Sequence, residues 1–177
     1  MLLCKPKKRK QVMEGEQGIC LRSLQPNKDA AQLMTGAGKE EWIQVHQTIL
    51  ASADAHAWAA IRKGLIIGQL DIYAIVAGEL GKHFQANAHD AVLQYRMLPA
   101  ASGAAMHREL LLLFLQYYFD NQKAGLLYAQ VNIYDGKTCR LYESAGFIFQ
   151  QNTMLSSQAV SLYLMTRAQL NEQCKKV

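Results

Sequence analysis

Residues 91–120, AVLQYRMLPAASGAAMHRELLLLFLQYYFD, decide the fold that this sequence predicts. A strand at 91–98 stops at a proline, and the small residues at 100–105 form a loop. Residues 106–120 are apolar on nearly every side, which is typical of a central helix packed against a sheet. Another strand follows at 126–132, so the two strands must pair in parallel through the helix that connects them.

The rest of the chain supplies further strands and shorter helices around this unit. Two polar-rich helices follow the first strand, and in the second helix Trp42, Val45, His46 and Ile49 share one face. Two strands around a tight turn then form a hairpin, with Gly68 as a candidate bulge. The expected strands are 18–24, 56–62, 65–76, 147–151 and 160–166, and the expected helices are 27–35, 39–52 and 136–145.

This order of elements predicts an α+β fold, arranged as an α/β three-layer domain. We expect a mixed, mostly antiparallel sheet of about six or seven strands with about four helices on its two faces. The chain of 177 residues suits one domain, which would span residues 18–168. Residues 1–17 would form a basic mobile tail and residues 169–177 a C-terminal tail. A ligand site is expected where the strand before the small-residue loop meets the central helix.

Positive charge is concentrated at the N-terminus. The net charge is +5, and residues 5–10, KPKKRK, hold five basic side chains, so the remainder of the chain is neutral. This run is typical of a solvated tail, and it also resembles a nuclear localisation signal or a polyanion contact, so both interpretations stay open. The neutral body argues against a nucleic-acid partner and shows no broad acidic surface that would suggest a polyamine.

The cysteines and the apolar runs bear on the environment of the protein. Cys4, Cys20, Cys139 and Cys174 are scattered without CxxC pairing, which predicts reduced thiols, no disulfide framework and no metal site. The longest apolar run, LLLLFL at 110–115, falls short of the roughly 18–20 residues that span a bilayer. The start MLLC is too short for the apolar part of a signal peptide. We therefore expect a cytoplasmic protein with no membrane partner.

The most specific pattern in the chain is DGKTCRLYESAGF at residues 135–147. Asp135 is a candidate N-cap, and Gly146 stands just after the helix, where glycine favours the left-handed backbone. With the order of elements, this segment resembles the final helix of the GNAT superfamily of N-acetyltransferases, over about residues 19–166. The family pattern is Asn, two residues, a small residue and LYEKxGF. Asp135 takes the Asn position, Thr138 the small one, and Leu141, Tyr142, Glu143, Gly146 and Phe147 match directly.

The resemblance implies a pyrophosphate-binding loop after the strand at 91–98. In the family the loop reads Arg or Gln, two residues, Gly, one residue, and Gly or Ala. Its backbone N–H groups at a helix N-terminus hold the diphosphate of acetyl-CoA. One alignment makes Gly103 the first glycine, with Ala100 and Ala105 at the ends. The preferred alignment keeps the family's distance between Pro99 and the loop. In this alignment the loop lacks the basic first residue and the small last residue.

The preferred alignment also places Leu110 and Leu111 on the apolar helix positions of the family. It implies acetyl-CoA as the cosubstrate, with the first helical turn near the phosphates, where His107 and Arg108 could add positive charge. The residues it assigns to acetyl-CoA are Met97, Leu98, Ser102, Gly103, Ala104, Ala105, Met106, His107 and Asp135.

The resemblance also implies a reaction, the direct attack of an amine on the thioester in a ternary complex. Tyr142 is the expected general acid for the departing thiolate, and packing in the core is its alternative role. A backbone N–H around Met97 would hold the thioester oxygen. Asp90 is the candidate base that accepts the proton of the amine, with His89 and Glu79 as weaker alternatives.

The predicted function is therefore N-acetyl transfer to a primary amine of a small molecule or peptide. Two alternatives stay open. One is a GNAT-fold binding module without catalysis, and the other is an acyltransferase that takes a longer acyl chain from a carrier protein, with Leu113 and Phe114 lining an apolar tunnel. The sequence specifies neither the acceptor nor the oligomeric state, so a homodimer also stays open.

Overall fold

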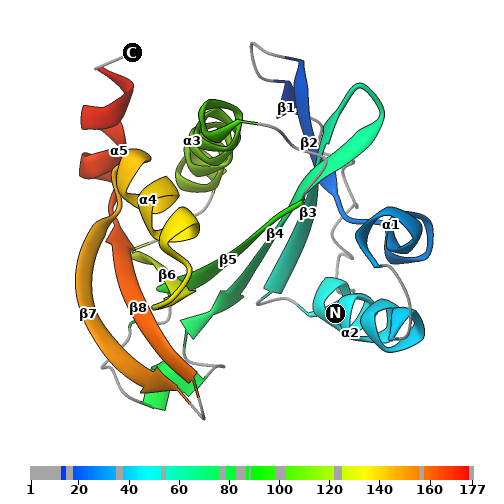
Figure 1. The fold of residues 1–177 in the computed structure, drawn as a ribbon, viewed down its shortest axis with the longest axis horizontal. Coiled ribbons are helices and arrows are strands. Elements are labelled where there is room, and N and C mark those ends of the chain that lie inside the picture. The colour runs from blue at the N-terminus through cyan, green and yellow to red at the C-terminus, as the bar shows by residue number, and fades with distance from the viewer. Residues whose placement is uncertain are drawn as a thin grey trace, which may run out of the picture.

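A computed structural model gives the fold of the chain. It describes residues 13–14, 18–34, 38–52, 55–75, 79–82, 87, 89–98, 103–121, 125–155 and 158–175. Within these ranges one sheet holds eight strands in the order β1-β2-β3-β4-β5-β6-β8-β7 (Figure 1). The strands are β1 (Met13–Glu14), β2 (Ile19–Ser23), β3 (Ala55–Arg62), β4 (Leu65–Ala74), β5 (Ala91–Met97), β6 (Leu127–Asn132), β7 (Ile148–Leu155) and β8 (Gln158–Met165). The helices are α1 (Pro26–Leu33), α2 (Lys39–Ala51), α3 (Ala104–Asn121), α4 (Gly136–Ser144) and α5 (Arg167–Cys174), with a 3-10 turn, η2 (Glu79–Lys82).

The pairing of the strands confirms the predicted fold class. Only β5 and β6 pair in parallel, and every other neighbouring pair in the described sheet is antiparallel. The parallel pair is joined through α3, as the crossover rule requires. Each predicted strand and helix is present with its ends shifted by at most two residues, except that β7 runs four residues beyond its predicted end.

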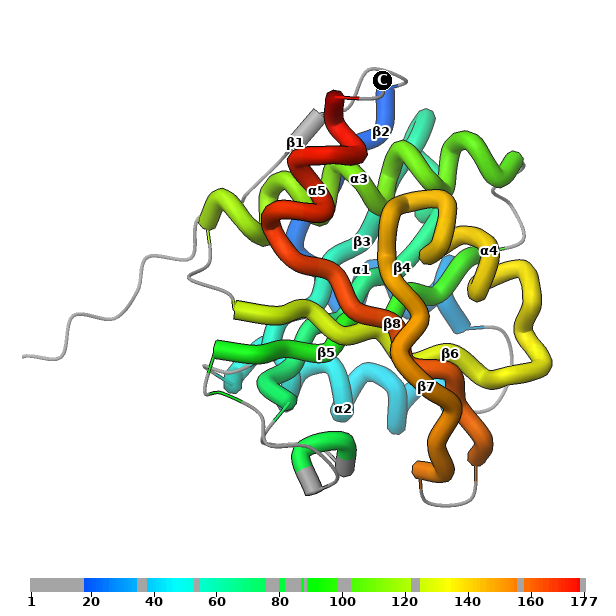
Figure 2. The backbone as a smooth tube through the Cα atoms, turned by 90° about the vertical axis from the view of Figure 1, so that its left-hand side faces the viewer, coloured from blue at the N-terminus to red at the C-terminus, as the bar shows by residue number. Residues whose placement is uncertain are grey.

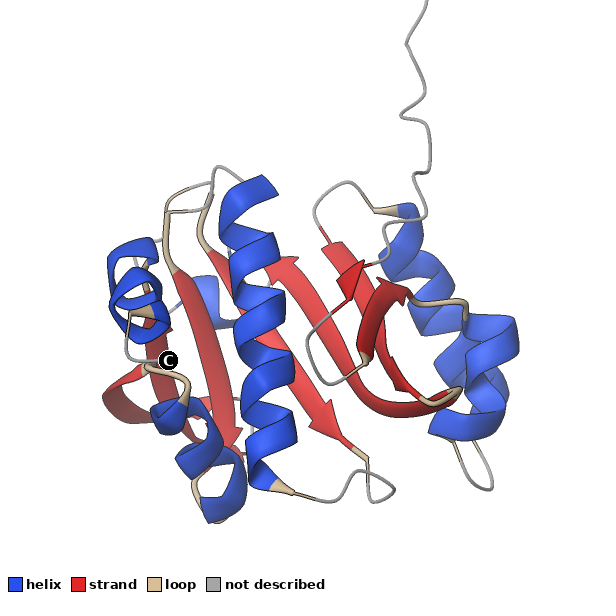
Figure 3. Ribbon diagram, turned by 90° about the horizontal axis from the view of Figure 1, so that it is seen from above, coloured by secondary structure: helices blue, strands red, loops and turns tan. Residues whose placement is uncertain are grey.

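Helices cover both faces of the sheet. Leu110, Leu111 and Phe114 of α3 are fully buried against one face, together with side chains of α4 and α5. Leu33 of α1 and Trp42 of α2 pack on the opposite face. Figures 1 and 3 show α1 and α2 on one side of the sheet and α3 lying along the other. Strands covered in this way must be apolar on both faces, which explains the long apolar runs of the sequence.

The β3–β4 hairpin has the turn and the irregularity that its glycines indicated. Gly64 in the turn has φ +79°, a conformation that glycine adopts without strain. The register shifts between Ala60, opposite Gly68, and Ile61, opposite Ile66, so Ile67 is bulged beside Gly68. In α2, by contrast, Val45 does not share the buried face that the sequence predicted, because its side chain is 49% exposed.

Both ends of the chain differ from the predicted tails where the structure describes them. Residues 13–14 form β1 on β2, and the basic run at 5–10 lies outside the described residues. Residues 169–174 belong to α5, which begins with a capping box between Thr166 and Gln169. Leu170 of α5 is buried, and the helix lies beside α3 (Figure 2). Leu170 is the only buried residue of α5, so this polar segment shows no clear helical period of apolar residues. No described helix is long and apolar enough to cross a membrane.

Candidate active site

The parallel strands β5 and β6 pair over only part of their length. Ala91, Val92 and Leu93 pair with residues 127–129 of β6, and the later residues of the two strands have no pairing with each other. On its other edge β5 stays paired with β4 as far as Met97. The sheet therefore splits between β5 and β6 at the end nearest the start of α3.

The backbone of β5 offers hydrogen-bond donors to this split. The Ala91 N–H donates towards β6, to the Leu126 oxygen, whereas the Leu98 N–H donates towards β4, to the Ile67 oxygen. Because successive residues of a strand turn their N–H groups to opposite edges, those of Tyr95 and Met97 face β6. In the split, no paired residue of β6 accepts from them. Met97, around which a backbone donor was expected, thus directs its N–H into the split.

Tyr142 is positioned by the end of α4. The Phe147 N–H donates to the Tyr142 carbonyl and the Gly146 N–H to the Glu143 carbonyl, which together form a Schellman motif. Gly146 has φ +97°, as predicted for the residue after the helix. The Phe147 ring meets the Tyr142 ring edge to face, with centroids 4.8 Å apart. These contacts hold the tyrosine with its side chain turned into the protein.

The hydroxyl of Tyr142 reaches the split. The side chain is 1% exposed, and this burial raises the pKa of its phenol. A hydrogen bond from the Tyr95 backbone has the opposite, smaller effect on that pKa. That bond places the hydroxyl beside the β5 backbone, from the face of the sheet that carries α3 and α4. A protonated phenol at this position can donate a proton to a group held in the split.

The start of α3 has the form of an anion site at a helix N-terminus. Gly103 has φ +110°, and α3 begins immediately after it. Ala104 and Ala105 are exposed, and the N–H groups of the first helical turn have no carbonyl within the helix. Arg62 of β3 brings positive charge to this turn, since its Nη1 lies 3.2 Å from Sδ of the buried Met106. Ser102 lies outside the described residues.

His107 and Leu98 are turned away from the place where the resemblance put them. His107 is 5% exposed, and its Nδ1 shares a hydrogen bond with the Tyr95 hydroxyl inside the core. Burial raises the pKa of that hydroxyl. Leu98 packs in the cluster beneath α1 and α2. Arg108 donates to the Ser144 carbonyl at the end of α4, 2.7 Å away. These side chains thus support the fold rather than presenting charge to a phosphate.

Asp135 caps α4, as predicted. Its Oδ1 accepts from the Thr138 N–H at 3.1 Å and its Oδ2 from the Thr138 hydroxyl at 2.6 Å. The side-chain bond from Thr138, with weaker help from backbone N–H groups and Lys137, lowers the pKa of the carboxyl. Both oxygens are therefore occupied by the cap.

Asp90 lies at the opposite end of β5 from the split. Its side chain is 2% exposed, Oδ2 accepts from the Asn87 N–H, and Oδ1 accepts from the Leu126 N–H at 3.0 Å. A Cβ on Gly125 would lie 2.7 Å from Oδ1, so a larger residue there would displace the carboxylate. The carboxylate joins the starts of β5 and β6, and the structure does not bring it near Tyr142. His89 is exposed beside it, and the Glu79 side chain lies outside the described residues.

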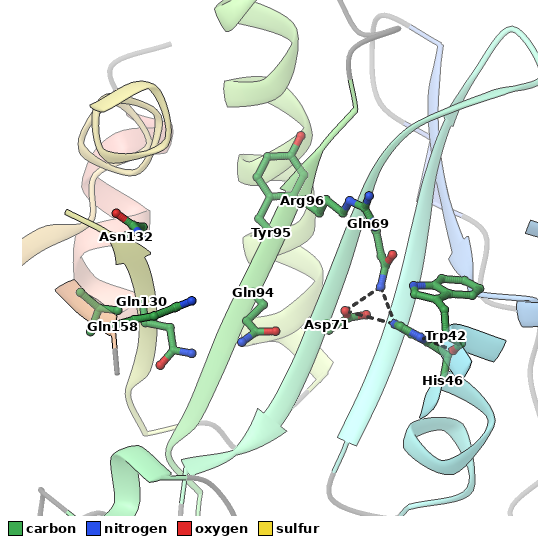
Figure 4. Close-up of a pocket in the computed structure, with 11 residues that line it drawn as sticks. Trp42, His46, Gln69, Asp71, Gln94, Tyr95, Arg96, Gln130, Asn132 and Gln158 are labelled. Atoms are coloured by element: carbon green, nitrogen blue, oxygen red, sulfur yellow. Dashed lines mark hydrogen bonds and ion pairs between the residues drawn. The ribbon is translucent and has the colours of Figure 1, made fainter. Parts of the chain in front are cut away.

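A cavity of about 390 Å³ lies on the face of the sheet that carries α2 (Figure 4). It extends from α2 across β4 and β5 to β6 and β8, so it reaches the split from the face opposite Tyr142. The Tyr95 ring points away from it, towards α3. Its lining is rich in carboxamides and consists of Trp42, His46, Gln69, Asp71, Gln94, Tyr95, Arg96, Gln130, Asn132, Gln158 and Val160.

A buried polar cluster closes one end of the cavity. The His46 Nδ1 lies 2.8 Å from the Trp42 carbonyl, and Gln69 Nε2 lies 2.6 Å from both His46 Nε2 and Asp71 Oδ2. Burial acts to lower the pKa of His46, but the Asp71 carboxylate and the Trp42 carbonyl outweigh it, so the pKa is raised. From the sequence, His46 was expected only on one face of a helix with Trp42, and Gln69 and Asp71 were not singled out. The available signal was the polar alternation of Gln69, Asp71 and Tyr73 in an apolar strand.

Further carboxamides bridge the split on this face. The Tyr73 hydroxyl of β4 accepts from Gln94 Nε2 of β5 at 3.0 Å and from Gln130 Nε2 of β6 at 3.2 Å. Burial raises the pKa of Tyr73 to about 12, so the phenol stays neutral at physiological pH. The cavity floor is thus polar but carries little charge. Among the described residues, no group of three His, Cys, Asp or Glu side chains could hold a metal ion.

The split parallel pair, the α3 crossover and the α4 helix ending in AGF together define the GNAT fold. No known family profile and no curated protein matches the sequence. Among solved structures, an uncharacterized protein from Bacillus halodurans is similar, with a TM-score of 0.81 at 12% identity over 94% of each chain.

Two further similar structures are acetyltransferases. The aminoglycoside acetyltransferase AAC(6')-Ib, in complex with coenzyme A, has a TM-score of 0.73 at 16% identity, over 88% of this chain and 99% of its own. Ribosomal-protein-S5-alanine acetyltransferase from Vibrio fischeri has a TM-score of 0.67 at 14% identity, over 88% of this chain and 96% of its own. At these identities the comparison establishes the fold, which agrees with the resemblance in residues 135–147.

Proposed function

We propose that this protein is an N-acetyltransferase that transfers acetyl from acetyl-CoA to a primary amine. The observation that carries the proposal is the split between β5 and β6, where the Met97 N–H faces the opening and the Tyr95 backbone bonds the hydroxyl of the buried Tyr142. Acetyl-CoA supplies an activated acetyl thioester. The similar structures include acetyltransferases named for an aminoglycoside and for a ribosomal protein, so both a small-molecule and a peptide amine are candidate acceptors.

The described residues fit this cosubstrate. The free edge of β5 can pair with an extended amide-containing chain, as an added strand would. The exposed first turn of α3 after Gly103 offers N–H donors and a helix dipole to a diphosphate. The basic residue missing from the loop has a substitute in Arg62, which lies against Met106 at this turn.

The chain then performs three tasks. The Met97 N–H donates to the thioester oxygen, where negative charge develops during the attack, while the Tyr95 N–H holds the Tyr142 hydroxyl. The cavity admits the neutral amine from the face opposite Tyr142, so its nitrogen forms the new bond to the acetyl carbon. Tyr142 donates a proton to the sulfur as the carbon–sulfur bond breaks. The proton released by the amine leaves through the polar cavity, because Asp90 lies at the far end of β5.

Two measurements test the proposal. Calorimetric titration with acetyl-CoA should show micromolar binding, and thiol release with a panel of primary amines should show turnover. A folded protein that neither binds acetyl-CoA nor releases thiol would contradict the proposal. Binding without turnover on any amine would instead indicate a binding module. Transfer only from an acylated carrier protein would indicate a longer acyl donor, although Phe114 packs on Trp58 in the core.

A further inference from the structure

The cluster of His46, Gln69 and Asp71 contains hydrogen-bond acceptors without partners. Gln69 Oε1 and Asp71 Oδ1 are both buried and accept from no group of the described chain. An unsatisfied buried acceptor costs about 1–3 kcal/mol, so a ligand that supplies donors there would recover this energy. Both unpaired atoms are oxygens that accept hydrogen bonds. A ligand that pairs with them must therefore supply hydrogen-bond donors.

The neighbouring groups favour a positively charged donor. Among the described residues that line the cavity, Asp71 is the only carboxylate, and its side chain keeps 16% exposure. The Trp42 ring, which stacks on His46 with centroids 4.1 Å apart, adds an aromatic surface of the kind that attracts ammonium groups. Arg96, the arginine of this lining, lies with its Nη1 3.6 Å from Met34 Sδ, towards α1.

The cluster lies one strand away from the reaction centre. Asp71 on β4 is opposite Gln94 on β5, and the split lies beyond the far edge of β5. Since adjacent strands are about 4.8 Å apart, a group beside Asp71 is roughly 7–10 Å from a thioester bound along β5. An amine held by Asp71 is therefore not the amine that is acetylated.

From this placement we infer that the cluster binds a second amino group of the acceptor, with Asp71 and Gln69 accepting its N–H bonds. This inference rests on the proposed function and narrows its substrate class to compounds with two amino groups about 7–10 Å apart. The neutral surface of the protein is no obstacle, because one buried carboxylate provides the recognition. His46 contributes its neutral form, in which Nδ1–H donates to Trp42 and Nε2 accepts from Gln69.

The test compares 1,6-diaminohexane, whose amino groups can span this distance, with 1-aminohexane and with 1,3-diaminopropane. In steady-state acetylation, kcat/KM for 1,6-diaminohexane should be about ten- to a hundred-fold higher than for either, since hydrogen bonds to a charged group have that effect. Asp71→Asn should bring the ratio of the two six-carbon amines close to one. Asp120→Asn, on an exposed carboxylate paired with Arg167, should keep the wild-type ratio.

Equal kcat/KM for 1,6-diaminohexane and 1-aminohexane with the wild-type protein would overturn the inference, even if Asp71→Asn fails to fold. An equal loss of kcat/KM for both amines in Asp71→Asn would also overturn it, because Asp71 would then act on structure alone. A folded protein that acetylates neither amine would instead contradict the proposed function itself. If acetyl-CoA and simple amines react without any preference for the diamine, the proposed function stands and this inference fails.

A pH series gives a second readout. Protonated His46 would pair with Asp71, whose carboxylate lies 3.5 Å from Nε2, and would compete with the ligand. Asp71 favours this charged form, whereas burial and Arg96 oppose it, and the net effect raises the pKa of His46. Binding of 1,6-diaminohexane should therefore strengthen as pH rises through that pKa. Affinity that stays constant or falls over this range would contradict the role given to Asp71.

Discussion

At the residue scale, the hydroxyl of Tyr142 distinguishes it from the leucine that a core helix could use. The ring fills the core between Phe147 and Tyr163, which leucine could do in part. A buried hydroxyl needs a hydrogen-bond partner, and the partner here is the Tyr95 backbone at the split. Packing alone would not require the hydroxyl of Tyr142, which lies at the edge of the split sheet. Its location there is better explained by a role in catalysis.

Tyr142→Phe should therefore separate chemistry from stability. Loss of the proton donor should lower kcat by about a hundred-fold or more, as for other general acids. Stability should change by only about 1 kcal/mol, because one hydrogen bond is lost and the ring is retained. Steady-state kinetics and urea unfolding measure the two effects. Tyr163→Phe is the matched control, since its hydroxyl donates to Glu143 and should leave kcat unchanged. Unchanged kcat in Tyr142→Phe would assign Tyr142 to packing.

At the element scale, α4 shows how much of the fold could be predicted. Asp135 and Gly146 were identified as its cap and its stop from single letters, because capping and left-handed backbone are local requirements. The short α5 was missed because only Leu170 of that helix is buried. Likewise β1 was assigned to a tail, since two residues give no alternation.

The cap of α4 makes stability depend on pH. The folded state lowers the pKa of Asp135 from 3.8, so its contribution is present above that value and is lost as pH falls through the folded pKa. Asp135→Ala should cost about 0.5–2 kcal/mol at neutral pH. The difference from wild type should shrink as pH drops below 3.8. Urea unfolding of both proteins over this range measures it, and a difference that stayed constant in acid would show that the charge plays no part.

At the scale of the whole molecule, the candidate site could be predicted only in part. The resemblance proposed Tyr142 from the contiguous motif at 135–147, and it proposed the strand near Met97 from the position of that strand before Pro99. The cavity joins α2, β4, β5, β6 and β8, and pairs such as His46 with Asp71 become neighbours only through strand order. Asp90 was misjudged for the same reason, since its sequence position did not reveal that its oxygens join two strands.

The split sheet predicts a pattern of amide exchange that a fully paired sheet cannot show. Along β5, Gln94 and Arg96 direct their N–H groups to β4, and Met97 directs its N–H to the split. By residue-resolved hydrogen exchange, the Met97 amide should therefore exchange faster than those of Gln94 and Arg96 in the free protein. Leu93, which is paired on both sides, is the protected reference.

Acetyl-CoA should change this pattern at the split alone. If its amide chain pairs with the free edge of β5, Met97 exchange should slow at least about ten-fold, while Leu93 changes only by the general stabilisation that any ligand confers. Uniform slowing of all four amides would indicate binding elsewhere on the fold. A Met97 amide already as protected as Gln94 without ligand would mean that the strands do not part there. Slowing confined to the open edge, followed by normal exchange after CoA is removed, would place the thioester beside Tyr142.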